Sequence, residues 1–167
     1  TGGIKTKTGF EIQTASGETF VAKKIIFATG IKDIMADIDG YADCWGISVL
    51  HCPYCHGYEV RNARTGILGN GENGFEFSCL ISNWTKELTL FTNGESTLTT
   101  EQAAKLESHH IKIIETGIEK FQHSNGCLQN IIFKDGTKYP VKALYASSPF
   151  EQHCKIPGDL ACEMNDE

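Results

Sequence analysis

One stretch decides the fold class of this chain: Thr65-Gly66-Ile67-Leu68-Gly69-Asn70-Gly71-Glu72-Asn73-Gly74. Its first four residues predict a buried strand, and apolar residues fall at helical spacing from residue 75 to residue 84. Between them stand three glycines at G-x-G-x-x-G spacing. A strand, a tight glycine turn and a helix amino terminus are what a dinucleotide pyrophosphate needs, because the backbone must approach the phosphates closely. The stretch therefore predicts a dinucleotide-binding unit.

Alternating strand and helix patterns continue beyond this stretch. Leu88–Phe91 is a predicted strand, Thr99 or Thr100 is predicted to cap a helix, and Ile111–Ile114 is a third predicted strand. Such alternation favours the α/β class with a Rossmann-like doubly wound parallel sheet. From residue 118 onward the pattern is β again, and we expect a β-meander there before the chain returns to the sheet.

A similar β pattern opens the chain. Residues 10–21 read as a hairpin, and the apolar run Lys24–Ala28 is predicted to be a strand. The stretch from Ser16 to Thr29 matches the stretch from Asp135 to Ser147 in pattern. Either a meander that returns to a sheet is used twice, or two ordinary hairpins look alike.

The repeat, if real, sets the domain boundaries. Residues 1–30 would be the carboxyl-terminal remnant of one nucleotide-binding domain, residues 31–150 a second such domain, and residues 151–167 the start of the return to the first. The chain opens on Thr1, without an initiator Met, inside a predicted meander, so we expect a missing amino-terminal portion.

Composition excludes several function classes. A formal charge of -6 without a basic cluster disfavours nucleic acid as a partner. No apolar run approaches the roughly 20 residues that a membrane span needs, so we expect no membrane partner and a cytoplasmic location. Seven cysteines are an odd number, and five of them are scattered, so we interpret those five as structural thiols and expect no metal site.

Two cysteines form a motif, Cys52-Pro53-Tyr54-Cys55-His56. The C-x-x-C spacing brings two thiols close enough for a reversible disulfide and lowers the pKa of one of them, and the thiolate is the nucleophile. His56 could carry a proton to a leaving thiolate, because histidine titrates near neutral pH; the alternative is an ordinary turn histidine. Cys52, Cys55 and His56 are therefore the candidate catalytic residues.

Other interpretations of this motif are weaker. A c-type haem would need export and an axial ligand, and structural zinc would need a second cysteine pair at similar spacing. C-P-Y-C also occurs in glutaredoxins, where it opens a helix. Here the chain leads quickly to a predicted strand at Thr65, which leaves no room for that helix.

The nucleotide is harder to identify than the turn that would bind it. An acidic residue at the end of the second strand would bind the ribose of NAD, but this chain has Thr92 and Asn93 there. Both side chains could form hydrogen bonds to a phosphate, so NADPH is expected, with NADH as the alternative. Besides Gly69, Gly71 and Gly74, the turn residues Asn70 and Glu72 are assigned to cofactor binding.

The order of these motifs resembles the low-molecular-weight thioredoxin reductases. Ala28-Thr29-Gly30, the cysteine motif with its continuation Gly57-Tyr58-Glu59, and the glycine turn follow one another as in that family. The continuation is most similar to the branch that includes oxidases of small dithiols. The resemblance implies that Cys55 faces a flavin, that Cys52 attacks the substrate, and that Thr29 and Gly30 also belong to a cofactor site.

The same resemblance implies a function for the parent protein. Electrons would pass between nicotinamide, FAD, the Cys52–Cys55 disulfide and a thioredoxin-like protein or a small-molecule disulfide or dithiol. The family tends to form homodimers. The FAD glycine loop is missing here, so the chain alone is expected neither to bind FAD nor to turn over. The alternative is a nucleotide-binding module that senses redox state without catalysis.

Overall fold

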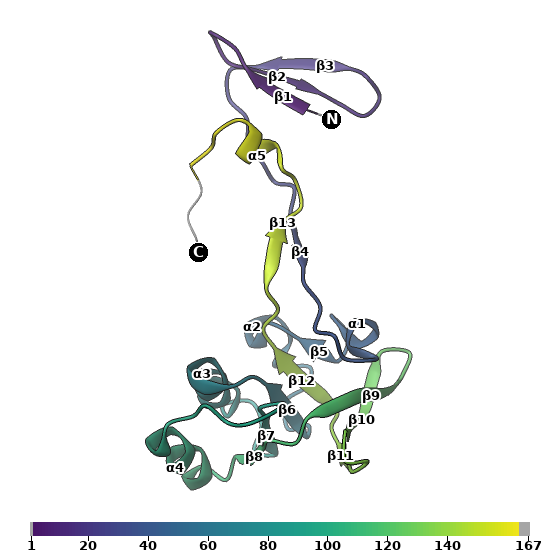
Figure 1. The fold of residues 1–167 in the computed structure, drawn as a ribbon, viewed down its shortest axis with the longest axis vertical. Coiled ribbons are helices and arrows are strands. Elements are labelled where there is room, and N and C mark those ends of the chain that lie inside the picture. The colour runs from purple at the N-terminus through teal and green to yellow at the C-terminus, as the bar shows by residue number, and fades with distance from the viewer. Residues whose placement is uncertain (1, 164–167) are drawn as a thin grey trace. The chain divides into compact units, whose positions relative to one another are not determined.

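The computed structural model describes residues 2–163 and divides the chain into two compact units (Figure 1). One unit is Met35–Ser148, and the other combines Thr1–Ile34 with Pro149–Glu167. The predicted ranges 1–30 and 151–167 extend over residue 1 and residues 164–167, which lie outside the described residues.

A five-stranded parallel sheet forms the centre of the Met35–Ser148 unit. In sheet order its strands are β5 (Val49–Leu50), β12 (Ala143–Ala146), β6 (Thr65–Leu68), β7 (Leu88–Phe91) and β8 (Lys112–Ile114). The helix α3 (Gly71–Ile81) connects β6 to β7, and α4 (Thr100–Ser108) connects β7 to β8. This arrangement confirms the predicted α/β class and its parallel sheet.

Side chains alternate between two cores on the two faces of this sheet, as strand geometry requires. Leu90 packs in the core that includes Ile81 of α3 and Leu106 of α4. Its neighbour Phe91 packs in the other core, with Phe133 of the meander. Figure 1 shows α3 and α4 on one side of the sheet and the meander on the other. Because both faces of the sheet are covered, its strands are largely apolar along their length.

The predicted meander is present as three antiparallel strands. These are β9 (Ile118–Ser124), β10 (Cys127–Phe133) and β11 (Lys138–Pro140). Two single-turn helices, α1 (Tyr41–Cys44) and α2 (Pro53–His56), precede the glycine turn along the chain. The predicted cap of α4 is confirmed, because the Thr99 hydroxyl accepts from the backbone N–H of Gln102 and the Gln102 side chain accepts from the backbone N–H of Thr99.

The second unit is smaller and mostly β. Its strands are β1 (Gly2–Lys5), β2 (Phe10–Gln13), β3 (Thr19–Ala22), β4 (Ile31–Asp33) and β13 (Phe150–Gln152), followed by the short helix α5 (Ile156–Asp159). The first three form an antiparallel sheet, and β4 pairs with β13. A Cβ on Gly3 would lie 3.0 Å from Ile156, so α5 packs closely against β1.

One predicted strand is wrong. Lys24–Ala28 is not a strand, and Ile26 in the middle of it is 91% exposed. An apolar strand is held by neighbouring strands that pair with its backbone, and within residues 2–163 none pairs with this segment. The matching segment of the predicted repeat, β12, does form a strand because β5 and β6 flank it.

Helices in the described part of the chain are short. None of those within residues 2–163 is long and apolar enough to cross a membrane.

Candidate functional site

The Cys-Pro-Tyr-Cys motif forms the first turn of α2. Cys52 is the residue before the helix, with extended backbone, and Pro53 takes the first helical position, where a missing N–H costs nothing. Cys55 lies one turn further along, so the two thiols share a face. The Cys55 thiol donates to the Cys52 sulfur, with 2.8 Å between the Sγ atoms. Both cysteines are free thiols in this structure.

The hydrogen bond between the thiols makes them chemically different. The Cys55 thiol, assisted by backbone N–H groups, holds the pKa of Cys52 below its ordinary value, against a smaller opposing effect of burial. The pKa of Cys55 is raised, mainly because its thiol donates to Cys52, and further by burial and by the negative charge of Cys52. When the pair loses one proton, the thiolate therefore resides on Cys52.

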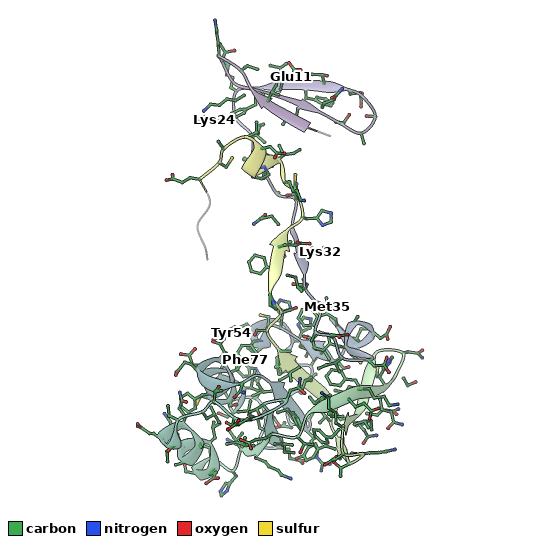
Figure 2. The ribbon with its side chains drawn as sticks, viewed as in Figure 1. Glu11, Lys24, Lys32, Met35, Tyr54 and Phe77 are labelled. Carbon is green, nitrogen blue, oxygen red and sulfur yellow. The ribbon has the colours of Figure 1, made fainter. Side chains whose placement is uncertain are left out.

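Packing against Trp84 fixes α2. A Cβ on Gly57 would collide with the carbonyl of Pro53 and the indole of Trp84, so only glycine allows this approach. Tyr54, labelled in Figure 2, lies edge-on to the same indole at 5.8 Å between ring centroids. Trp84 therefore packs against the short helix that carries the cysteine pair. Sequence reasoning did not identify Trp84.

Two polar side-chain atoms are buried without a hydrogen-bond partner among residues 2–163. They are Nδ1 of His56, which belongs to α2, and the hydroxyl of Tyr145 on β12. His56 was predicted from its place in the motif. Sequence reasoning missed Tyr145, because a tyrosine inside an apolar strand is normally interpreted as a core residue. The only signal was its position in a strand that ends beside the predicted sites.

The glycine turn lies after β6, as predicted. A Cβ on Gly74 would lie 2.9 Å from the carbonyl carbon of Gly69, so the first and third glycines let the helix approach the strand. Gly71 has a φ of 54°, and a Cβ there would lie 2.8 Å from the Thr97 hydroxyl oxygen. All three glycines are thus required by the backbone.

Asn70 connects this turn to the loop after β7. Its Oδ1 accepts from the N–H of Gly71 at 2.9 Å and from the N–H and hydroxyl of Thr97 at 2.8 and 3.2 Å. Its Nδ2 donates to the carbonyl of Glu95 at 2.9 Å. The Glu72 carboxylate likewise accepts from Gln102 of α4 at 2.7 Å. Both side chains, which the sequence assigned to a cofactor, bind other parts of the protein.

Thr92 and Asn93 also have partners within the fold. The Thr92 hydroxyl is buried and donates to the carbonyl of Gly94 at 2.7 Å. Asn93 Oδ1 accepts from the N–H of Ile118 at 2.7 Å. The two side chains predicted to bind a phosphate therefore stabilise the turn after β7.

Carboxylates line one cavity beside the glycine turn and another beside α4 and β8. The first, of 270 Å³, is lined by Gly69, Glu76 and Ser147 among others, and the second, of 770 Å³, by Glu107 and Glu115 among others. Neither lining contains Lys or Arg. The close glycine backbone fits a dinucleotide, and neither cavity offers a cation for the additional 2′-phosphate of NADPH.

The remaining predicted residues, Thr29 and Gly30, belong to the smaller unit. Thr29 lines a 550 Å³ cavity together with residues 153–156 and Asp159. The Gly30 carbonyl accepts from the N–H of His153. The cysteine pair and the glycine turn thus share one unit, and these two residues lie in the other. Within residues 2–163 no group of three His, Cys, Asp or Glu side chains could hold a metal ion.

Comparison with known proteins gives a consistent result. The family model described as pyridine nucleotide-disulphide oxidoreductase matches residues 3–166. Thioredoxin reductase tcpT of Claviceps purpurea is 39% identical over 97 residues, which cover 55% of this chain and 30% of that protein. Thioredoxin reductase aclD of Aspergillus oryzae is 33% identical over 135 residues, which cover 77% of this chain and 43% of that protein.

A solved structure supports the same relationship. The putative thioredoxin reductase TrxB of Bacillus anthracis superposes with a TM-score of 0.88 at 26% identity, covering 97% of this chain and 55% of that one. The chain therefore spans less than half the length of the two fungal relatives and about half of the bacterial one.

Proposed function

The chain belongs to the pyridine nucleotide-disulphide oxidoreductase family, and from this premise we propose that Cys52 and Cys55 are the redox-active pair of a thioredoxin reductase-like enzyme. The observation that carries the proposal is the 2.8 Å contact in which one thiol donates to the other. A pair in this geometry can store two electrons as a dithiol and release them by forming a disulfide.

The order of the two steps follows from the pKa difference. The Cys52 thiolate attacks a substrate disulfide, whose S–S bond breaks and releases one sulfur as a thiolate. Cys55 then loses its proton and attacks Cys52 in the mixed disulfide, which releases the second substrate sulfur. The products are the Cys52–Cys55 disulfide and a substrate dithiol that has gained two electrons. His56, whose Nδ1 has no partner among the described residues, is proposed to carry the proton between these sulfurs.

Exposed aromatic side chains beside the pair are suited to substrate contact. Tyr54 is 78% exposed and Tyr58 is 70% exposed. The guanidinium of Arg61 lies 3.8 Å from the centroid of the Tyr58 ring. We assign the substrate to a thioredoxin-like protein disulfide or a small-molecule disulfide or dithiol, because either can present a sulfur to a thiol pair of which Cys55 is exposed and Cys52 partly exposed, flanked by aromatic rings.

Flavin and a nicotinamide nucleotide, when bound to the full-length protein, would supply the two-electron step that restores the dithiol. In this chain Gly69 and Gly74 provide the close backbone approach that a nucleotide pyrophosphate needs. The carboxylates in the neighbouring cavities favour NADH over NADPH. The bonds that Asn70 makes across the turn support a second candidate function, in which the pair oxidises substrate dithiols and the electrons pass through flavin to oxygen, without nicotinamide.

The smaller unit is proposed to belong to the flavin-binding domain. It exposes several large apolar side chains in a short length of chain: Ile4, Phe20, Val21, Ile26, Ile31, Ile34 and Phe150. Isolated exposed apolar residues are common, but this density is typical of a surface that packs against more protein. Flavin absorbance in the full-length protein tests this assignment, and a colourless protein that still binds nucleotide would favour the redox-sensing alternative.

Substitution of the cysteines in the full-length protein tests the proposal itself. Cys52→Ser and Cys55→Ser should each reduce the rate of disulfide reduction to that of the uncatalysed reaction, because each removes one of the two sulfurs. Cys127→Ser is the matched control, since Cys127 is also an exposed free thiol and should not change the rate. Full activity in either of the first two variants would contradict the proposal.

Titration of the same protein with NADPH and NADH separates the cofactor candidates. Tighter binding of NADH, followed by nicotinamide fluorescence, is the expected result. Binding of neither would leave flavin-dependent dithiol oxidation as the function.

A further inference from the structure

The register of the parallel sheet places Tyr145 beside the strand that leads into the redox pair. Tyr145 on β12 lies opposite Leu50 on β5 and opposite Ile67 on β6. All three pack in the core on the same face of the sheet. Cys52 follows Leu50 by two residues, just beyond the end of β5. Tyr145 therefore lies on the strand next to the one that leads into the first cysteine of the pair.

The Tyr145 side chain is buried, but its hydroxyl forms no hydrogen bond to the described residues. The residue is 1% exposed, and Phe77 of α3 lies edge-on to its ring at 6.4 Å between centroids. The hydroxyl has no hydrogen-bond partner among the described residues. A buried hydroxyl without a partner destabilises a fold, and phenylalanine would fill the same volume without that cost. Packing alone therefore does not explain a tyrosine at this position.

Burial and two negatively charged groups raise the pKa of this hydroxyl. Burial is the main cause that raises the pKa of Tyr145 to about 12, and the negative charges of Cys52 and then Glu59 raise it further. From α3 the ring is contacted by Phe77, which carries no charge. The hydroxyl consequently keeps its proton at every physiological pH and remains a hydrogen-bond donor.

We infer that the Tyr145 hydroxyl is the hydrogen-bond donor that stabilises the Cys52 thiolate when Cys55 has no proton to donate. The inference rests on the proposed function of the pair. In the dithiol form Cys55 itself donates to Cys52. When a two-electron reductant attacks the Cys55 sulfur of the disulfide, a bond to Cys55 forms, the S–S bond breaks, and Cys52 leaves as a thiolate that has lost this donor. The thiolate then accepts from the Tyr145 hydroxyl, which otherwise has no partner among the described residues.

Removal of Cys55 isolates this interaction for measurement. In the full-length Cys55→Ala protein, the rate at which iodoacetamide alkylates Cys52 is measured from pH 5 to pH 10 by quantifying the Cys52 peptide by mass spectrometry. Adding Tyr145→Phe should slow alkylation at pH 7 about tenfold and move the midpoint of the profile to higher pH, because a hydrogen bond to a charged group contributes about 1.5–3 kcal/mol. Adding Tyr139→Phe is the matched control, because the Tyr139 hydroxyl contacts Thr89.

The outcomes separate this inference from the proposed function. An unchanged Cys52 profile with Tyr145→Phe, or an equal shift with Tyr139→Phe, would overturn the role of Tyr145. Alkylation needs neither turnover nor a cofactor, so it gives an answer even if Cys52→Ser leaves disulfide reduction intact and the proposed function fails. A merely structural role for Tyr145 would change stability without moving the midpoint of the profile.

Discussion

The redox pair and the glycine turn follow two strands of one parallel sheet, yet the two regions differ in whether their polar side chains have hydrogen-bond partners. At the glycine turn the Asn70 side chain forms four hydrogen bonds within the protein. At the pair, the hydroxyl of Tyr145 and Nδ1 of His56 are buried with no partner among the described residues. Saturated polar groups hold a fold together, whereas unsatisfied ones remain available for chemistry. The contrast supports the proposal that the chemistry occurs at the cysteines.

The glycine turn should be the more sensitive of the two regions to added volume. Gly74→Ala would place a Cβ 2.9 Å from the Gly69 backbone, which cannot move aside as a side chain can. We expect the free energy of unfolding to fall by about 1–3 kcal/mol, measured by urea denaturation. Gly117→Ala is the control, because its Cβ would meet only the flexible stem of Lys134. Equal effects of the two substitutions would remove the argument that the turn is tightly packed.

Loss of the Asn70 side chain should have the next largest effect. Asn70→Ala removes the cap of α3 and the bonds to the loop after β7, so the free energy of unfolding should fall by about 1–2 kcal/mol. Hydrogen exchange at the Thr97 amide should become faster, because that amide donates to Asn70. Asn130→Ala, which loses one contact to Gln122, should change stability less. Unchanged exchange at Thr97 would show that the loop does not depend on Asn70.

Tyr139 has a hydrogen-bonded hydroxyl, whereas the hydroxyl of Tyr145 has no partner among the described residues, so the two can be compared. Tyr139→Phe should lower the free energy of unfolding by about 1 kcal/mol, since its hydroxyl lies 2.9 Å from the Thr89 hydroxyl. Tyr145→Phe should leave stability unchanged or raise it, because its hydroxyl has no partner among the described residues. Chemical denaturation at neutral pH measures both. A clear loss of stability in Tyr145→Phe would mean that the hydroxyl is already bonded, which would contradict the contrast drawn above.

Stability at alkaline pH should depend on Tyr145. Its pKa rises from an ordinary value of 10 to about 12, mainly through burial. Between these values the unfolded chain has lost the tyrosine proton while the folded chain keeps it. The free energy of unfolding is therefore unaffected by this ionisation below pH 10 and falls as pH rises towards 12. Tyr145→Phe should lose less stability over this interval. Identical pH dependence in the two proteins would indicate that the hydroxyl ionises in the fold as readily as in water.

Sequence reasoning predicted those features that depend on local pattern. Four strands of the central sheet, β6, β7, β8 and β12, and the cap of α4 were predicted correctly, because buried strands are apolar and Thr99 is followed three residues later by Gln102. Lys24–Ala28 was predicted wrongly, since strand formation depends on neighbours that pattern cannot show. Tyr145 was missed for a related reason: its importance comes from register with β5, a contact across 95 residues of sequence.

The predicted binding roles of Asn70, Thr92 and Asn93 illustrate a further limit. A sequence shows that a side chain can donate or accept hydrogen bonds, but it does not show which partner the fold supplies. In the structure all three have partners in the protein. Nucleotide binding at this turn therefore stays a prediction.

The central claim is that Cys52 attacks the substrate and Cys55 resolves the mixed disulfide. The most direct test treats the full-length Cys55→Ser variant with a disulfide substrate, such as oxidised thioredoxin or a small aromatic disulfide, and identifies the adduct by peptide mass spectrometry. We predict a mixed disulfide that accumulates on Cys52, because the residue that would release it is gone. An adduct on another cysteine, or none under conditions in which the unmodified protein reduces the same substrate, would contradict the account.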